Sequence, residues 1–389
     1  MTNHYSRHEL AKRYVSQFLS NQGLTTTSVL VAAPRRTGKT TFVRKDLIPA
    51  LEKEGAVVIY ADLWSDQQQD PAQVIARAVL KKLHEMQATP KWLRGVESVE
   101  LTIAGVGLSA SNALTKDITF TDALAELSDK TSKKIVLIVD EFQHALTTEK
   151  GKSALFALKA ARDEVNSGDH FGMVLLGTGS NQDKLAAMRN SKEQAFYLTP
   201  LIELPRLDQN FTNWLCDISS LPLDRADVWE LFQKSGHKPE IVSDVIKNLS
   251  LSFLANKNMK EDFREKITET LDREKNIQQE KINSLPTVQW SVLAFMAMKE
   301  KDIFLQSQAA CVKCEDLSQK RGEKVKMTIS SIQSALSALK KKKIIWMEDR
   351  GVYHIEDEAI ASLIKNQVLD LTNTGLVPSN VPKRKNRRS

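Results

Sequence analysis

Cysteine is scarce in this chain, with three residues among 389. A small, odd number of cysteines argues against a disulfide framework and is typical of proteins in a reducing compartment. Cys311 and Cys314 form an isolated C-x-x-C pair. Because zinc sites of this type need further ligands at matching spacing, a chance spacing on a helix is the favoured interpretation over zinc or redox chemistry.

Long apolar runs are also missing. No hydrophobic stretch approaches the roughly 20 residues that a membrane-spanning helix needs. The first residues, 1–5, lack the charged and then apolar pattern of a secretory signal. The sequence therefore predicts a soluble, cytoplasmic protein without a membrane partner. Its hydrophobic content of 41% is sufficient for the cores of two or three domains.

A broad basic surface is absent as well, although the formal net charge is +7. Five of these charges come from Lys383, Arg384, Lys385, Arg387 and Arg388, which leaves a net charge of +2 on residues 1–382. Any contact with nucleic-acid phosphates must then come from local clusters or from the tail. We interpret this tail either as a solubilising segment or as a nonspecific phosphate anchor.

The most informative segment joins an apolar run, 28–32, to a Gly-Lys-Thr sequence. A strand, a turn and a helix from about Gly38 would form a loop whose backbone N–H groups and helix dipole bind phosphate. Lys39 would reach the β and γ phosphates of ATP, and the Thr40 hydroxyl would ligate Mg²⁺. Ala33 replaces the first glycine of the G-x-x-x-x-G-K-[ST] pattern. The predicted nucleotide-binding residues of this loop are Ala33, Pro34, Arg35, Arg36, Thr37, Gly38, Lys39, Thr40 and Thr41.

A second aliphatic run, 135–139, ends in two carboxylates. Five consecutive aliphatic residues indicate a central parallel strand that is covered on both faces. Asp140, at the end of that strand, would hold Mg²⁺ through water, and Glu141 would accept a proton from the attacking water. The alternative, that both residues only solvate a strand end, is weakened by the phosphate loop earlier in the chain.

A third strand is predicted over 171–176, and it is followed by small polar residues. Thr178 or Ser180 would then lie beside the γ-phosphate and sense it. A plain glycine-rich turn into the next helix is the alternative. The alternation in 99–109 further predicts a small hairpin inserted in the core, either as ordinary decoration or as a flap that binds a partner.

The rhythm of strands and helices predicts an α/β fold with a parallel sheet, whose ligand lies at the carboxyl edge of the strands. After the core the predicted strands give way to helical periods, which indicate a helical lid. The predicted organisation is an N-terminal helix over 1–27, a P-loop ATPase core over 28–206, a lid over 207–283, a winged-helix domain over 284–366 and a basic, disordered tail over 367–389.

The winged-helix prediction rests on helices at 288–299, 311–321 and 328–341 and a hairpin at 344–355. The third helix would contact bases if DNA were bound. The basic residues that flank it are Lys320, Arg321, Lys324, Lys326 and the run 340–343. The acidic Glu348 and Asp349 near the hairpin tip oppose this interpretation, and the alternative is a packing or dimer module.

Together these motifs resemble the P-loop ATPases of the AAA+ and STAND classes, most closely the archaeal-type prokaryotic ATPases related to origin-recognition ATPases. The similarity spans roughly residues 5–365 and rests on the segments 34–40, 139–143, 177–180, 202–205 and 236–239. It implies an ATPase with a lid helix that begins near His237 and Pro239, close to the nucleotide. Such families often carry an arginine before the last core strand, and residues 194–198 contain none. Arg189 is the first substitute and Arg206 the second, supplied by a neighbouring subunit of a homo-oligomer.

Three functions follow as hypotheses. The leading one is a switch that binds ATP or ADP, hydrolyses ATP and works on DNA through the winged helix and tail. The competing one is a signalling or defence scaffold of the STAND type, which acts through a protein partner without DNA. A third is a transcriptional regulator for which ATP is a ligand and not a fuel.

Overall fold

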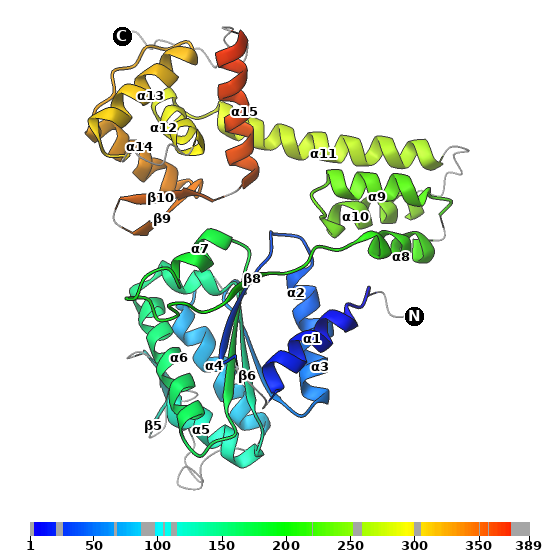
Figure 1. Ribbon diagram of the computed structural model, residues 1–389, viewed down its shortest axis with the longest axis vertical. Helices are drawn as coiled ribbons and strands as arrows, with labels where there is room; N and C mark the ends of the chain where they lie inside the picture. Colours follow the sequence, from blue (N-terminus) through cyan, green and yellow to red (C-terminus); the bar gives the residue numbers. More distant parts are fainter. Residues whose placement is uncertain are drawn as a thin grey trace. The chain divides into compact units, whose positions relative to one another are not determined.

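The computed structural model describes residues 4–20, 26–65, 68–86, 98–103, 106–109, 115–219, 221–251, 259–298, 305–349, 351–356 and 358–374. The chain forms two compact units, Met1–Met259 and Lys260–Ser389 (Figure 1). Throughout the described ranges, no helix combines the length and the apolar character needed to cross a membrane.

The first unit is built on a five-stranded sheet in the order β2-β6-β7-β1-β8, with every neighbouring pair parallel. All residues of β1, β6 and β7 are buried, as expected for strands covered on both faces. The predicted α/β class and parallel sheet are therefore confirmed. The strands are β1 (Ser28–Ala32), β2 (Val57–Asp62), β6 (Ile135–Asp140), β7 (Met173–Gly179) and β8 (Leu201–Glu203).

Helices cover both faces of this sheet (Figure 1). Alternate residues of β1 face opposite sides: Leu30 packs in one core with α4, α5 and α6, while Val29 packs in a second core with α1, α2 and α3. The helices are α1 (His8–Leu19), α2 (Lys39–Phe42), α3 (Ile48–Lys53), α4 (Pro71–Glu85), α5 (Phe120–Thr131), α6 (Glu149–Ser167) and α7 (Gln182–Ala187), with a 3₁₀ helix at Phe142–Thr147.

Two local features of the core differ from the sequence analysis. The helix after the phosphate loop is interrupted by a π-helical turn at Val43–Leu47. In addition, β7 continues through Thr178, whereas the strand predicted from the sequence ends at residue 176. Glycine is needed at position 177 of this strand, since an added Cβ would lie 2.4 Å from Cδ1 of Phe142.

The predicted hairpin at 99–109 is present as β3 (Ser98–Ile103) and β4 (Val106–Ser109). A third strand, β5 (Thr115–Thr119), runs parallel to β3 and was not anticipated. Its short T-K-D-I-T sequence leads directly into α5, whose first turn is capped by the Thr119 side chain. Because this short segment runs directly into a capped helix, the sequence alone indicates the start of a helix there and not a strand.

The described elements over 207–283 are helices, as predicted. Three of them belong to the first unit, namely α8 (Gln209–Ser219), α9 (Arg225–Lys234) and α10 (Pro239–Leu251). The next helix, α11 (Met259–Asn283), groups almost entirely with the second unit. The predicted lid, 207–283, therefore crosses the division between the two units.

The second unit contains the predicted helices and hairpin. They are α12 (Thr287–Met298), α13 (Gln308–Lys320), α14 (Ile329–Lys341) and the antiparallel pair β9 (Ile345–Asp349) and β10 (Val352–Ile355). Cys311 and Cys314 are buried on α13, and burial raises the pKa of the Cys314 thiol to about 12. Their positions indicate a role in apolar packing.

The last helix, α15 (Glu358–Thr374), extends beyond the predicted start of the tail at residue 367. Val368 and Leu371 are 4% and 6% exposed and continue the apolar stripe of this helix into the core of the second unit. The basic residues 383–388 lie outside the described residues, so the prediction for the end of the tail stays a prediction.

Candidate nucleotide-binding site

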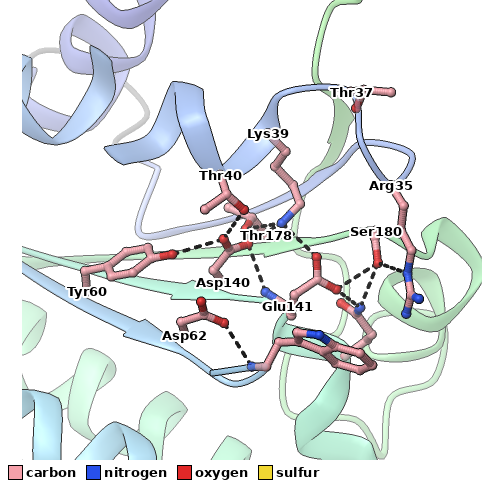
Figure 2. A network of polar contacts seen from close by, with 12 residues as sticks. Arg35, Thr37, Lys39, Thr40, Tyr60, Asp62, Asp140, Glu141, Thr178 and Ser180 are labelled. Atoms are coloured by element: carbon pink, nitrogen blue, oxygen red, sulfur yellow. Dashed lines mark hydrogen bonds and ion pairs between the residues drawn. The ribbon is translucent and has the colours of Figure 1, made fainter. Parts of the chain in front are cut away.

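The phosphate loop positions Lys39 at the carboxyl edge of the sheet (Figure 2). Gly38, with a φ of 87°, makes the left-handed turn that starts α2, and Lys39 is its first residue. The Lys39 ammonium forms an ion pair with Asp140 and lies 3.0 Å from Oε1 of Glu141. It also donates a hydrogen bond of 3.3 Å to Oγ1 of Thr178. Groups at the end of β6 and in β7 thus meet at the cation that the loop after β1 supplies.

Asp140 is surrounded by donors. Its Oδ2 accepts hydrogen bonds from Thr40 Oγ1 at 2.7 Å and from the Tyr60 hydroxyl at 3.1 Å, and its Oδ1 accepts one from Thr178. Burial alone raises the pKa of this carboxyl, but Lys39 and the hydroxyl donors together hold the pKa of Asp140 below its usual range. The burial of Tyr60 and the nearby Asp140 in turn raise the pKa of the phenol. These donors therefore favour the ionised form of Asp140.

Glu141 directly follows the strand and adopts a left-handed backbone conformation, with a φ of 53°. Its Oε2 accepts hydrogen bonds from Ser180 Oγ at 2.7 Å and from Gln143 Nε2 at 2.5 Å. Burial raises the pKa of Glu141, and the charge of Lys39 with these hydrogen bonds lowers it to a net value below normal. A non-glycine residue in this conformation is uncommon and is found preferentially at functional sites.

These groups line a cavity of about 350 Å³. Two of its residues, Asp62 and Trp64, were not among the predicted site residues. Asp62 lies opposite Asp140 in the register of β2 and β6, so the pairing of adjacent parallel strands would have predicted it. The lining residues are Pro34, Arg35, Arg36, Gly38, Lys39, Thr40, Thr41, Asp62, Trp64, Asp140, Glu141 and Ser180.

Some predicted residues of the loop lie behind this surface. Ala33 and Thr37 are buried, and the Thr37 hydroxyl donates a hydrogen bond of 2.7 Å to the carbonyl oxygen of Pro34. Thr178 is 1% exposed and lies beneath Lys39 and Asp140. These residues shape the loop and hold its charged groups without lining the cavity.

The predicted lid residues lie at the start of α10. His237 packs edge-on against the rings of Trp229 and Phe232 and hydrogen-bonds to the Leu207 carbonyl oxygen at 3.0 Å. The ring of Pro239 lies close to the loop, since a Cβ added at Gly38 would be 4.0 Å from it. Neither residue lines the described cavity.

The predicted arginines are also outside the cavity lining. Nε of Arg189 donates a hydrogen bond of 2.5 Å to the carbonyl oxygen of Thr199, which ties it to its own chain. Arg206 follows Pro205 in the exposed segment between β8 and α8. Neither arginine therefore lines the described cavity of its own chain.

The residues present fit a Mg²⁺ ion. Thr40 Oγ1 and Asp140 Oδ2 are hard oxygen donors 2.7 Å apart, and Mg²⁺ is commonly held by one or two protein oxygens together with phosphate oxygens. Across the described ranges, no three His, Cys, Asp or Glu side chains group closely enough to hold a metal ion. The fit is thus to a metal that is bound jointly with a nucleotide.

The ion pairs of this site predict a dependence of stability on pH. The pKa of Asp140 is lower in the folded protein than in the unfolded chain, so the unfolded state binds the proton first. The stabilisation of the folded state by Asp140 is present above about pH 4. It is lost as the pH falls through the pKa of Asp140 in the folded protein. Replacing Asp140 with Asn should flatten this acid loss, which urea unfolding at a series of pH values measures. Equal acid slopes in both proteins would contradict the prediction.

The sheet order and the site define a P-loop nucleotide-binding protein of the α/β class. Residues 23–185 match the family model of the AAA domain. No curated protein matches the sequence.

Solved structures extend the similarity to the whole chain. The Walker-type ATPase PABY2304 of Pyrococcus abyssi matches with a TM-score of 0.52 at 16% identity, covering 92% of this chain and 95% of that one. The Aeropyrum pernix ORC2 protein in its ADP form matches with a TM-score of 0.56, also at 16% identity, covering 93% and 92%. The family resemblance predicted from the sequence is thus confirmed for the AAA domain model and for the fold of these two structures.

Proposed function

We propose that the protein binds ATP with Mg²⁺ and hydrolyses it to ADP and phosphate. The observation that carries this proposal is the meeting of Lys39, Asp140, Glu141 and Thr178 at the ends of three adjacent strands. Phosphoryl transfer to water requires a cation that binds phosphate, a pair of oxygens that hold a metal ion and a second carboxylate beside them. The AAA domain and the Walker-type ATPase fold support the same reaction.

In this proposal each residue has one role. Lys39 binds the β and γ phosphates, and Thr40 and Asp140 hold Mg²⁺, which shields phosphate charge when bound. Glu141 accepts a proton from the attacking water, and Thr178 senses the γ-phosphate. Nε of Arg36 lies 3.3 Å from a Glu240 carboxylate oxygen on α10, which supports a lid that responds to the state of the loop.

We further propose that the second unit contains a winged helix that binds DNA. The support comes from α14, whose sequence contains no acidic residue. Its exposed face carries hydroxyl and amide groups, and four consecutive lysines with exposed side chains span its C-terminal end, two in the last turn and two just after it. Ser and Gln side chains bind phosphates and base edges, and lysines neutralise phosphates. The exposed residues are Ser330, Gln333, Ser334, Ser337, Lys340, Lys341, Lys342 and Lys343.

The salt dependence of DNA affinity tests this second proposal. Each neutralised phosphate contributes about 0.9 to the slope of log K against log salt. Replacing all four lysines at 340–343 with alanine should therefore reduce the magnitude of that slope by two or more. Deleting residues 383–389 should reduce it further. Fluorescence anisotropy with duplex DNA measures it, and the matched control is Lys266→Ala on α11, an exposed lysine paired with Glu269.

The hairpin favours a second candidate, a scaffold that binds a protein. Met347 and Val352 are 40% and 44% exposed on β9 and β10, and the acidic Glu348 and Asp349 lie beside them in sequence. Apolar and acidic groups are poor partners for a phosphate backbone. If the intact protein does not bind DNA at low salt with ATP, ADP or neither, this candidate replaces the DNA-binding one.

A further inference from the structure

Arg35 lines the cavity and contacts residues outside the loop that carries it. It follows Pro34 in the turn after β1 and lines the cavity. Its Nε donates a hydrogen bond of 3.4 Å to Oγ of Ser180, just after β7, and its guanidinium carbon lies 5.0 Å from the centroid of the Trp64 ring. Figure 2 shows the side chain reaching from the loop to Ser180, which lies between Arg35 and Glu141. Two residues therefore hold this guanidinium, Ser180 after β7 and Trp64 after β2.

Arg35 and Glu141 share a partner. The Ser180 hydroxyl that accepts the bond from Arg35 donates to Oε2 of Glu141 at 2.7 Å. One hydroxyl therefore separates the guanidinium from the carboxylate that we propose as the base. The charge that develops on a transferred phosphoryl group lies next to such a base, because the attacking water lies between them.

The neighbouring arginine has a different environment. Arg36 has a φ of 64°, and its Nε lies near Glu240 on α10. Lys39, the other cation of the cavity, is already paired with both Asp140 and Glu141. Arg35 is thus the arginine of the loop that points to the proposed base, while the other cations face carboxylates.

We infer that Arg35 is a catalytic arginine supplied by the same chain, which stabilises the γ-phosphoryl group during hydrolysis. The inference rests on the proposed ATP hydrolysis. In that step the water oxygen forms a bond to the γ-phosphorus, and the bond from phosphorus to the β–γ bridging oxygen breaks with its electron pair staying on ADP. The proton lost by the water goes to Glu141, and Arg35 donates hydrogen bonds to the phosphoryl oxygens. No arginine from a neighbouring subunit is needed.

Trp64 acts as a positioning residue in this arrangement. A guanidinium over an indole face is held by cation–π attraction, and the ring of His144 supports the indole at 4.5 Å between centroids. Trp64→Ala should then lower kcat with little change in KM, whereas Trp64→Phe, which keeps an aromatic face, should largely restore the rate.

The central experiment compares the parent with Arg35→Gln. Arginines that act on the γ-phosphoryl group contribute about 10³ to 10⁵ in rate when supplied by a partner, so kcat should fall at least ~100-fold. The affinity for ADP should stay within a few-fold, because ADP lacks the γ-phosphate. The complex with Mg²⁺, ADP and aluminium fluoride, which mimics the transferred group, should no longer form, as followed by retention of a fluorescent ADP.

A matched control and a dilution series complete the experiment. Arg225→Gln changes an arginine on α9 that is 55% exposed and paired with Asp217, and it should behave as the parent. The rate per subunit of the parent should stay constant on dilution.

Two outcomes would overturn the inference while leaving ATP hydrolysis in place. In one, Arg35→Gln hydrolyses ATP and traps aluminium fluoride as the parent does. In the other, the rate per subunit rises with concentration, and Arg189→Gln is slow while Arg35→Gln is not. A parent protein that neither binds nor hydrolyses ATP would contradict the proposed function itself.

Discussion

Glu141→Gln is expected to bind ATP like the parent and to hydrolyse it at least ~100-fold more slowly, because a positioned base contributes roughly 10² to 10⁴ in rate. Glutamine can keep the hydrogen bond from Ser180 that Oε2 accepts in the parent, at 2.7 Å. The variant therefore removes the base while preserving the shape of the site. Single-turnover hydrolysis of radiolabelled ATP, with affinity measured separately by calorimetry, checks both parts.

Gln143→Ala is the informative companion to this variant. It removes the other side-chain donor to Glu141 Oε2 without removing the carboxylate. We expect a smaller loss of rate than for Glu141→Gln, because the base remains. If Glu141→Gln hydrolyses ATP at the parental rate, another group serves as the base and the proposed role of Glu141 is wrong.

Lys39→Ala is expected to have two large effects. It removes charge-assisted contacts worth roughly 1.5 to 3 kcal/mol each with the phosphates, so ATP affinity should fall at least tenfold per lost contact. It also leaves Asp140, which is 1% exposed, and Glu141 without their shared cation. Removing one partner of a buried ion pair typically destabilises a protein by about 3–5 kcal/mol. Calorimetry and urea unfolding measure the two effects separately.

The control for this change is Lys234→Ala on α9, whose ammonium is exposed and paired with Glu230. An exposed pair contributes little, so its stability should stay within about 0.5 kcal/mol of the parent. Unchanged ATP affinity in Lys39→Ala would reject the assignment of the phosphate loop. Unchanged stability at neutral pH would show that water solvates the two carboxylates once the lysine is gone.

The sequence predicted the parallel core because its strands are continuous aliphatic runs, and Lys39 and Asp140 because glycine and carboxylates follow such runs at known offsets. It did not predict Trp64 or Asp62 as cavity residues, since their relevance depends on which strands are neighbours. The pairing of β2 with β6 places Asp62 opposite Asp140, and that pairing joins residues far apart in the chain.

The different environments of the two loop arginines also could not be predicted from the sequence. Arg35 and Arg36 are adjacent and chemically identical, and only the backbone geometry separates them: Arg35 reaches Ser180 while Arg36 reaches Glu240. The end of α15 was missed for a different reason. Its last buried residues, Val368 and Leu371, are separated by the exposed Leu369 and Asp370, and only their burial in the core of the second unit distinguishes them.

The order of the strands also has a consequence for biosynthesis. β1, which carries the phosphate loop, pairs only with β7 and β8 in the described sheet, so its partners lie more than 140 residues later in the chain. β2 and β6 can pair earlier during translation, but β1 keeps two unpaired edges until β7 has left the ribosome and one unpaired edge until β8 follows. Such edges favour aggregation. A fragment cut at residue 185, the end of the matched AAA region, would keep one of them, so expression of the core should extend through β8.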